Sequence, residues 1–408
     1  MKRKEMLLCL SSIACFTSCA NSVGLCDLTG IDSTTVVIEI KEVDEKELSY
    51  SSVYSDVDYV MLEANEESVV GNIDKLEITK DGCYVVFDRP NGKIVLFGSD
   101  GRFLNRIGMM GHSKKEYVSP ELMCYDEYSD NVIVYDGARK CLLHYSLDGT
   151  LSRTTPLHKY VADFAVVDDG KIAVYANYRD VLEDGQVAYN LEVIDYDGAI
   201  IQQYDSYTKD KENYRPSPTN VLKICDGELL FHKYYSPIIY TMEGDEMKPK
   251  YFLDFMSKQI PSDWLELGSA EEINQRIFSR SSDVAYCTDF YDAHGKYIVS
   301  VTSSDGFINT VYVEKKNSSV QFKGANMVND VYGLVPSSIY GYRKGKVYGV
   351  VNPDVVGNFY SVTSNTETLE NYKDEMRNRG YDITTRDLGV LNEMKNNRNH
   401  VIQICTLK

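Results

Sequence analysis

The sequence has little of what marks several common protein classes. Its 408 residues include 43 Lys plus Arg against 61 Asp plus Glu, a formal net charge of -18. Because a phosphate backbone needs a cationic surface, nucleic-acid binding is not an expected function. Beyond the N-terminal segment, no run approaches the roughly 18 apolar residues of a membrane-spanning helix. With 10 Pro, 27 Gly and 43% hydrophobic residues, the composition excludes disordered and collagen-like chains and is that of a globular protein.

Signatures of catalysis and metal binding are also missing. The sequence contains neither His-Glu-x-x-His nor Gly-x-Ser-x-Gly, and its six histidines lie far apart. After Cys19 there are seven cysteines, an odd number without a close pair, which disfavours a disulfide framework or a zinc site. We therefore predict no catalytic residue, no metal ligand and no cofactor, and we expect the thiols to be buried.

The N-terminal residues indicate export. Lys2, Arg3 and Lys4 form a positive segment, an apolar stretch follows to Phe16, and small residues precede Cys19. This pattern is typical of a bacterial lipoprotein signal, with Cys19 as the lipidated residue; the alternative is an ordinary cleaved signal with an incidental cysteine. Because Ala20, and not Asp, follows the cysteine, we expect an outer membrane lipoprotein, facing the periplasm or the cell surface.

Three segments follow from composition. Residues 1–18 are the predicted signal peptide, residues 19–35 a lipidated flexible tether of small and polar residues, and residues 36–408 the folded domain. From Val36 onward the chain consists mostly of short Val, Ile, Tyr and Phe runs bounded by Asp-Gly or Asn-Gly turns. Such runs predict an all-β domain.

A turn motif recurs about every 48 residues within this domain. It surrounds Asp100, Asp148, Asp197 and Gly244, and each copy has an apolar run upstream of it. Further apolar runs raise the number of units to six, and a repeat of this period is typical of propellers and solenoids. The first unit accommodates four strands. We therefore predict a six-bladed β-propeller of four-stranded antiparallel blades.

Two features complete the predicted architecture. Helical patterns over Ser262–Phe278 and Thr366–Arg379 read as insertions between blades. The terminal run Val401–Leu407 could pair with an N-terminal strand such as Tyr59–Leu62. Closure by both chain ends would remove exposed sheet edges.

The sequence resembles the six-bladed β-propeller lipoproteins of Bacteroidota, an NHL-like propeller family, from about Ser49 to the C-terminus. The resemblance is carried by several motifs: Tyr59–Ile78, the Asp88, Phe97 and Asp100-Gly101 series, Arg106-Ile107-Gly108 leading to Glu116-Tyr117, Ile238–Phe255, and Asn329-Asp330. It departs from the family at Ser113-Lys114-Lys115 and at Asn399-His400. The resemblance implies the architecture and the envelope location, and no general catalytic role.

One face of the predicted propeller carries the long, varied loops, and binding residues concentrate on such loops. Comparable positions of four successive blades there hold the cations Arg89, Arg139, Arg179 and Lys233. Together they would form a positive ring around the channel mouth. The alternative is that each pairs with a neighbouring acid such as Asp88, Asp136 or Asp180, as in an ordinary surface ion pair.

Aromatic residues share these loops. Tyr178, Tyr234 and Tyr235 are the predicted ligand-binding aromatics, and Tyr189, Tyr214 and Trp264 lie nearby in sequence. Aromatic rings stack on sugar rings or cover apolar surface, and with 32 tyrosines many must serve packing.

The expected function is that of a lipid-anchored, non-catalytic binding or scaffolding propeller of the cell envelope. Its partner is a saccharide, a peptide or an envelope protein, bound on the loop-rich face. The alternatives are a propeller lyase or lactonase with a metal or acid/base group at the channel mouth, and a subunit of a nutrient-uptake complex with a broad partner-binding patch.

Replacing Cys19 by Ala tests the anchor. Because the acylated thiol is the one membrane attachment inferred, Cys19→Ala should release a soluble periplasmic protein or block processing. Fractionation and the size of the processed chain measure this. A variant that stays in the membrane fraction, processed normally and in normal amount, would contradict the lipoprotein interpretation.

Overall fold

The computed structural model describes most of the domain. The described residues are 31–43, 48–212, 214–216, 220–267, 269–306, 308–316, 319–323, 327–331, 337–352 and 397–408, with a few single positions between 371 and 394. Cys19 lies outside them, as does the helix expected over Thr366–Arg379 except for single positions.

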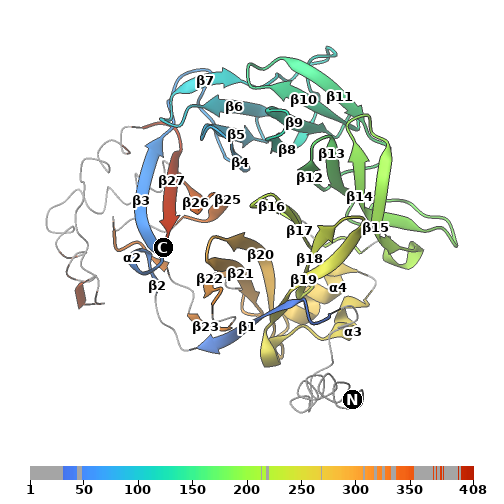
Figure 1. The fold of residues 1–408 in the computed structure, drawn as a ribbon, viewed down its shortest axis with the longest axis vertical. Coiled ribbons are helices and arrows are strands. Elements are labelled where there is room, and N and C mark those ends of the chain that lie inside the picture. The colour runs from blue at the N-terminus through green and yellow to red at the C-terminus, as the bar shows by residue number, and fades with distance from the viewer. Residues whose placement is uncertain are drawn as a thin grey trace, which may run out of the picture.

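Six antiparallel sheets are arranged radially around one axis, as Figure 1 shows, so the predicted six-bladed β-propeller is confirmed. The strands of the blades, in order from the axis outward, are β4 (Lys75–Ile78), β5 (Tyr84–Asp88), β6 (Lys93–Phe97) and β7 (Phe103–Arg106); β8 (Pro120–Asp126), β9 (Asn131–Asp136), β10 (Cys141–Ser146) and β11 (Leu151–Pro156); β12 (Asp163–Asp168), β13 (Lys171–Tyr175), β14 (Ala188–Asp195) and β15 (Ile200–Tyr207); β16 (Leu222–Cys225), β17 (Glu228–His232), β18 (Ile238–Glu243) and β19 (Glu246–Asp254); β20 (Ala285–Ala293), β21 (Lys296–Ser303) and β22 (Ile308–Glu314); and β25 (Ile339–Arg343), β26 (Lys346–Val351), β27 (Val401–Leu407) and β3 (Tyr54–Met61).

The middle strands of each blade explain the continuous apolar runs of the sequence. All five residues of β5 are buried, as are four of the five in β6. Neighbouring blades cover both faces of these strands, so apolar residues at successive positions are all enclosed. The outer strand β15, at the rim, exposes much of its length.

The recurring Asp-Gly turns lie where one blade meets the next. Gly101, Gly149 and Gly198 each have a φ near +83°, which favours glycine. A Cβ at Gly101 would lie 2.1 Å from the carbonyl oxygen of Met61, in the outer strand of the preceding blade. The same atom at Gly149 would lie 2.6 Å from the carbonyl oxygen of Arg106. The repeated glycine is therefore required by backbone packing between blades.

The chain ends close the ring in the sixth blade. Strand β27 pairs with β26 on one side and with β3 on the other, with Val401 opposite Met61. Ile402, in the middle of this arrangement, is fully buried. The N-terminal strand β3 and the C-terminal strand β27 thus belong to one sheet, and β27 is paired on both sides.

A second N-terminal strand joins the fourth and fifth blades. Strand β1 (Val36–Val43) pairs in parallel with β19 and, further along, with β23 (Ser319–Lys323), as seen at the bottom of Figure 1. A short parallel pair, β2 (Leu48–Ser49) with β24 (Met327–Val328), follows. Among the described residues, the fifth blade thus has three paired strands, β20, β21 and β22, and the following strand β23 pairs with β1.

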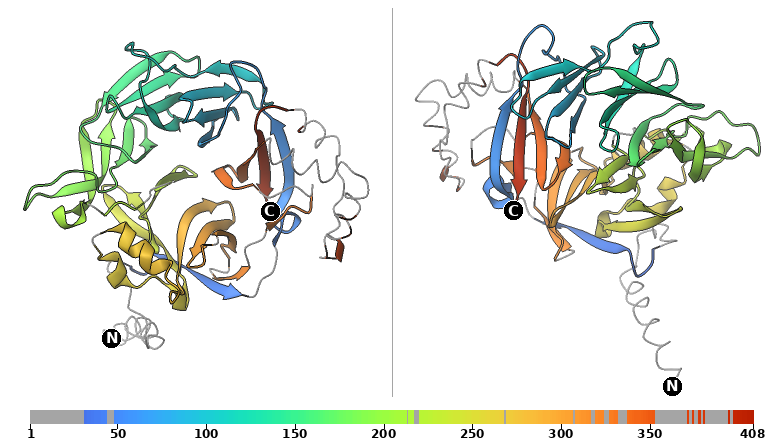
Figure 2. Two further views of the ribbon diagram at one scale, coloured as in Figure 1. Left: turned by 180° about the vertical axis from the view of Figure 1, so that it is seen from behind. Right: turned by 45° about the horizontal axis from the view of Figure 1, so that its top comes forward.

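The insertion after the fourth blade forms two helices where one was expected. The chain forms the 3₁₀ turn η2 (Met256–Lys258), then α3 (Ser262–Leu265) and α4 (Ala270–Ile277), which lie together beside that blade in Figure 2. Ser269 begins the second helix, since its side chain accepts a hydrogen bond of 3.2 Å from the backbone N–H of Glu272. The other short elements are α2 (Tyr50–Val53) and η1 (Lys209–Lys211). No described helix is long and apolar enough to cross a membrane.

Removing residues 401–408 should destabilise the whole ring, because it deletes the strand between β26 and β3 and exposes two edges. We expect a lower thermal midpoint and self-association, measured by calorimetry and light scattering. The milder Ile402→Ala should cost about 3 kcal/mol of unfolding free energy, whereas Thr406→Ala, at a partly exposed position, should cost under about 1 kcal/mol. A truncated protein with an unchanged midpoint and monomeric mass would show that closure does not depend on this strand.

Candidate functional site

The four predicted cations occupy equivalent loops. Arg89 follows β5, Arg139 follows β9, Arg179 follows β13 and Lys233 follows β17. Each loop connects the second strand of a blade to the third, so all four lie on the same face of the propeller. We refer to it as the loop face.

Three of these cations have a carboxylate partner. Arg89 Nη2 lies 3.8 Å from Asp74, Arg139 Nε lies 3.7 Å from Asp136, and Lys233 Nζ lies 2.7 Å from Asp205. The arginines of the second blade and third blade make other contacts as well: Arg139 donates to the carbonyl oxygens of Glu116 and Ser113, and Arg179 stacks over the Tyr160 ring at 4.0 Å. The pairing alternative therefore holds for three of the four, and binding of an anion by the ring stays a prediction.

Of the three acids suggested by sequence proximity, Asp136 is a partner of one of these cations, and the other two have different partners. Asp88 is fully buried and accepts hydrogen bonds from the backbone N–H of Gly71 and from Asn91, and Asp180 pairs with Lys159 at 3.3 Å. Asp136, also fully buried, accepts backbone N–H groups from the loop that enters its blade. Buried carboxylates that collect backbone donors hold loops in place, and this is the role of Asp88 and Asp136.

A pocket of about 530 Å³ lies on the loop face where the third and fourth blades meet. It is lined by aromatic, charged and hydroxyl side chains from both blades and the first inserted helix: Tyr175, Tyr178, Asp205, Ser206, Tyr207, Thr208, Lys211, Tyr214, Pro216, Lys233, Tyr234, Ser236, Ile238, Tyr240, Ser262, Leu265 and Glu266. The volume is in the range of small-molecule sites, about 300 to 1,000 Å³. We call it the tyrosine pocket.

The tyrosine pocket contains some of the predicted ligand-binding residues and omits others. Tyr178, Lys233 and Tyr234 line it, together with Tyr214. Tyr235 does not; only 1% of it is exposed, and its hydroxyl donates to Asn274 at 2.7 Å in the packed helical insertion. Arg89, Arg139 and Arg179 lie outside the pocket.

A polar network forms one wall of the tyrosine pocket. Lys233 Nζ donates to Asp205 Oδ1 at 2.7 Å, and Asn190 Nδ2 donates to Asp205 Oδ2 at 3.1 Å. Asn190 in turn accepts the backbone N–H of Tyr178 at 2.7 Å. Nearby Tyr178 and Asp205 raise the pKa of Lys233 well above its usual range although burial opposes this, so the lysine is cationic at neutral pH.

The backbone around the tyrosine pocket is strained. Asn177, Tyr178, Asp205 and Tyr235 have φ values of 55°, 56°, 53° and 68°, in the left-handed region that non-glycine residues rarely adopt. Such positions cost of order 1 to 3 kcal/mol each and cluster at functional sites. Two of these four residues, Tyr178 and Asp205, line the tyrosine pocket, and the other two are their close neighbours in sequence or in the lining. This part of the loop face is therefore the leading candidate site.

The tyrosine rings pack edge to face. The ring of Tyr178 lies 4.9 Å from that of Tyr207 and 5.0 Å from that of Tyr214. Burial raises the pKa of Tyr178 to about 12, so its hydroxyl remains protonated and can donate a hydrogen bond. The pocket thus combines rigid ring surfaces with a fixed cation, a carboxylate and hydroxyl donors.

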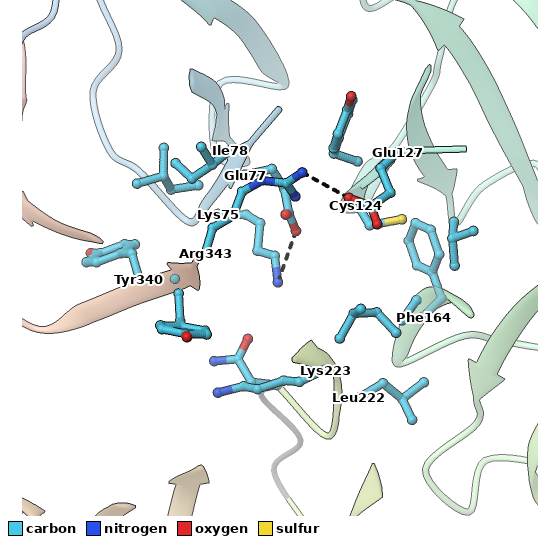
Figure 3. Close-up of a pocket in the computed structure, with 18 of the residues that line it drawn as sticks. Lys75, Glu77, Ile78, Cys124, Glu127, Phe164, Leu222, Lys223, Tyr340 and Arg343 are labelled. Atoms are coloured by element: carbon cyan, nitrogen blue, oxygen red, sulfur yellow. Dashed lines mark hydrogen bonds and ion pairs between the residues drawn. The ribbon is translucent and has the colours of Figure 1, made fainter. Parts of the chain in front are cut away.

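A second cavity, of about 160 Å³, lies on the propeller axis and is lined by residues of all six inner strands. Figure 3 shows Lys75 and Glu77 of β4 projecting toward the centre, with Lys223 of β16 and Arg343 of β25 also lining the cavity. We call it the axial cavity. Sequence reasoning missed it, although charged residues at alternate positions of the first strand, Lys75 and Glu77, were a usable signal.

The charges of the axial cavity are paired with one another. Lys75 lies 3.5 Å from Glu77, and Arg343 Nη2 lies 2.9 Å from Glu127, as the dashed lines in Figure 3 indicate. Lys223 contacts Asp289. Within the described part of the chain, no group of three or more His, Cys, Asp or Glu side chains is arranged to hold a metal ion.

Comparisons with known proteins identify the family. The model of the family described as Domain of unknown function (DUF4934) matches residues 35–406, so the chain belongs to this family. A Bacteroides fragilis protein described as exported superposes with a TM-score of 0.67 at 16% identity, covering 91% of this chain and 99% of that chain. This likeness shows a shared fold. The comparison with curated proteins gives no match.

Two other solved structures are more distant. A member of the DUF4221 family from Bacteroides vulgatus has a TM-score of 0.46 at 9% identity, covering 87% of this chain and 97% of that chain. A virginiamycin B lyase from Staphylococcus aureus has a TM-score of 0.33 at 11% identity, covering 63% and 73%.

The Lys233–Asp205 pair should contribute to stability. Lys233→Met leaves the Asp205 carboxylate, 14% exposed, without its cation, and should lower the unfolding free energy by about 2 kcal/mol. Adding Asp205→Asn should recover at least half of that loss. Arg89→Met, at an exposed and longer pair, should change stability by under about 0.5 kcal/mol. Urea unfolding measures all three, and equal effects of Lys233→Met and Arg89→Met would contradict the assigned network.

Proposed function

We propose that this member of the DUF4934 family is an exported, lipid-anchored binding propeller that takes a saccharide into the tyrosine pocket. The observation that carries the proposal is the pocket itself: about 530 Å³, lined by tyrosine rings and the Lys233–Asp205 pair, on backbone held in a strained conformation. A rigid site of this kind suits binding, because little ordering of the protein is needed when the ligand arrives.

The chemistry of the lining favours a saccharide over a peptide. A sugar ring presents apolar C–H faces and a rim of hydroxyls, which match aromatic rings and fixed polar groups. The Lys233 ammonium and the protonated Tyr178 hydroxyl supply donors, and Asp205 supplies acceptors. Extended peptides are commonly bound through an exposed sheet edge. Of the described strands at this pocket, β14, β17 and β18 are paired on both sides, and a sheet edge is present only along β15, the outer strand of its blade.

Envelope location rests on the N-terminal sequence and on the fold relative. Residues 1–18 have the charge and apolar pattern of a signal peptide, with Cys19 in the position for lipidation and residues 19–35 as the tether. The Bacteroides fragilis protein of similar fold is described as exported. We propose that this chain is an outer membrane lipoprotein of the same broad bacterial group, in which residues 36–408 form the propeller domain.

The described chain joins the propeller on the side opposite the tyrosine pocket. Strand β1 runs parallel to β19, with Val36 opposite Tyr251, and the Thr35 hydroxyl donates to the carbonyl oxygen of Pro249. The chain therefore enters from the side of the β18–β19 turn, which belongs to the face opposite the loop face. A tether that joins the domain on that side leaves the tyrosine pocket on the face opposite the attachment point.

Titration with soluble oligosaccharides tests the saccharide proposal. We expect at least one of cellotriose, maltotriose and xylotriose to bind the full chain in calorimetry. Tyr234→Ala should weaken that binding by about tenfold, a loss of about 1.4 kcal/mol, because it removes one ring face of the pocket. Tyr189→Ala is the matched control, because Tyr189 is a partly buried tyrosine near the start of β14 in the third blade and does not line the pocket.

Two results would overturn the proposal. Binding of tri-alanine in place of every saccharide tested would assign the pocket to peptides. Saccharide binding that Tyr189→Ala weakens as much as Tyr234→Ala would place the site elsewhere.

A further inference from the structure

The connection between the first two blades exposes two large apolar side chains on the loop face. The chain leaves β7 and reaches β8 only at Pro120, and within this connection Met109 is 55% exposed and Met110 is 53% exposed. Neither methionine lines the tyrosine pocket or the axial cavity. This surface is therefore separate from the site discussed above.

The exposed methionines adjoin a third exposed apolar side chain. Met110 covers Gly92, at which a Cβ would lie 2.1 Å from the methionine Sδ. The next residue, Lys93, donates to the carbonyl oxygen of Val69 at 2.6 Å, and Val69 is 41% exposed. Single exposed apolar residues are ordinary, whereas neighbouring ones from different loops mark an interaction surface.

Exposed lysines accompany this apolar surface. Lys114 and Lys115 lie in the turn that follows Met110, and Lys140 lies in the next loop, after β9. Among the residues that the structure describes, none of these three lysines forms an ion pair with a carboxylate, although the whole chain has a net charge of -18. Their charges are therefore available to an anionic partner.

The turn that carries the two lysines is held by its backbone. Arg139 donates to the carbonyl oxygens of Ser113 and Glu116 at 2.8 and 2.6 Å, and the Tyr145 hydroxyl donates to that of Lys115 at 3.0 Å. These contacts also join the turn to the neighbouring loop of the second blade. We call the surface formed by Val69, Met109, Met110, Lys114, Lys115 and Lys140 the lysine–methionine patch.

We propose that the lysine–methionine patch docks an acidic segment of a partner protein. Apolar side chains of the segment pack on the two methionines, whose flexible thioethers adapt to the shape of a partner. Carboxylates of the segment reach the lysines, which steer its approach and fix its orientation. Because the backbone of the turn is already fixed, docking orders little besides side chains.

The composition of the patch favours a protein over an anionic membrane. Membrane-binding surfaces commonly insert Trp or Phe among their basic residues. The exposed apolar side chains here, Val69, Met109 and Met110, include no aromatic ring. Methionine is enriched in protein interfaces, with charged residues at the rim.

Binding of a designed acidic peptide tests the proposal on the full chain. The fluorescent peptide Glu-Leu-Glu-Glu-Leu-Glu should bind, measured by anisotropy, with an affinity that falls as salt rises from about 50 to about 200 mM. Lys114→Glu combined with Lys115→Glu should weaken binding at least about tenfold, because like charges then face each other. Lys344→Glu combined with Lys346→Glu is the matched control, since these exposed lysines make the same change of charge on the opposite face.

A second peptide isolates the part played by the methionines. Glu-Ser-Glu-Glu-Ser-Glu should bind at least about threefold more weakly than the leucine peptide, and Met109→Gln should reduce that difference, as expected for two groups in contact. Tyr234→Ala should leave peptide binding unchanged, so this test is independent of the saccharide proposal.

Three results would overturn the proposal. The first is no binding of the leucine peptide at millimolar concentration in low salt. The second is equal weakening by the two double variants, both with unchanged thermal midpoints. The third is binding of phosphatidylglycerol vesicles, but of neither peptide, that the Lys114 and Lys115 replacements abolish; it would assign the patch to a membrane.

Discussion

The architecture depends on the backbone contact that the repeated glycine makes with the preceding blade. Gly101 and Gly149 each bring their turn against a carbonyl oxygen of the neighbouring outer strand, closer than any side chain would permit. In the fourth blade the corresponding Gly244 has no such neighbour, and Tyr204 instead donates its hydroxyl to the carbonyl oxygen of Asp245. Radial order is thus set by a few close contacts at the rim, and the apolar middle strands fill the space between them.

In the first three blades these close backbone contacts lie at one end of the blade, and the loops at the other end differ from blade to blade. On the loop face, Asp88 and Asp136 hold their loops by accepting backbone donors, so the first two blades are closed there. The third and fourth blades replace this device with the strained segment at Asn177 and Tyr178 and with the Lys233–Asp205 pair. The tyrosine pocket lies at the junction of these two blades.

The fold could be predicted from sequence because its signal is local: the Asp-Gly turns recur with the period of the blades, and in the first three blades the turn glycine contacts the preceding blade. The site could be predicted only in part. Lys233, Tyr178 and Tyr234 share a loop pattern and do meet, but the acids beside Arg89 and Arg179 in sequence are not their partners, because Asp74 and Tyr160 arrive from other segments. The axial cavity was missed because residues such as Lys223 and Asp289 come from different blades, and only closure of the ring brings them together.

The pairing of β27 with β3 also has a kinetic consequence. Val401 and Met61 are about 340 residues apart, so this sheet can form only after nearly the whole chain is present. Contacts of such long sequence separation carry a large loop-closure entropy and slow the final step of folding.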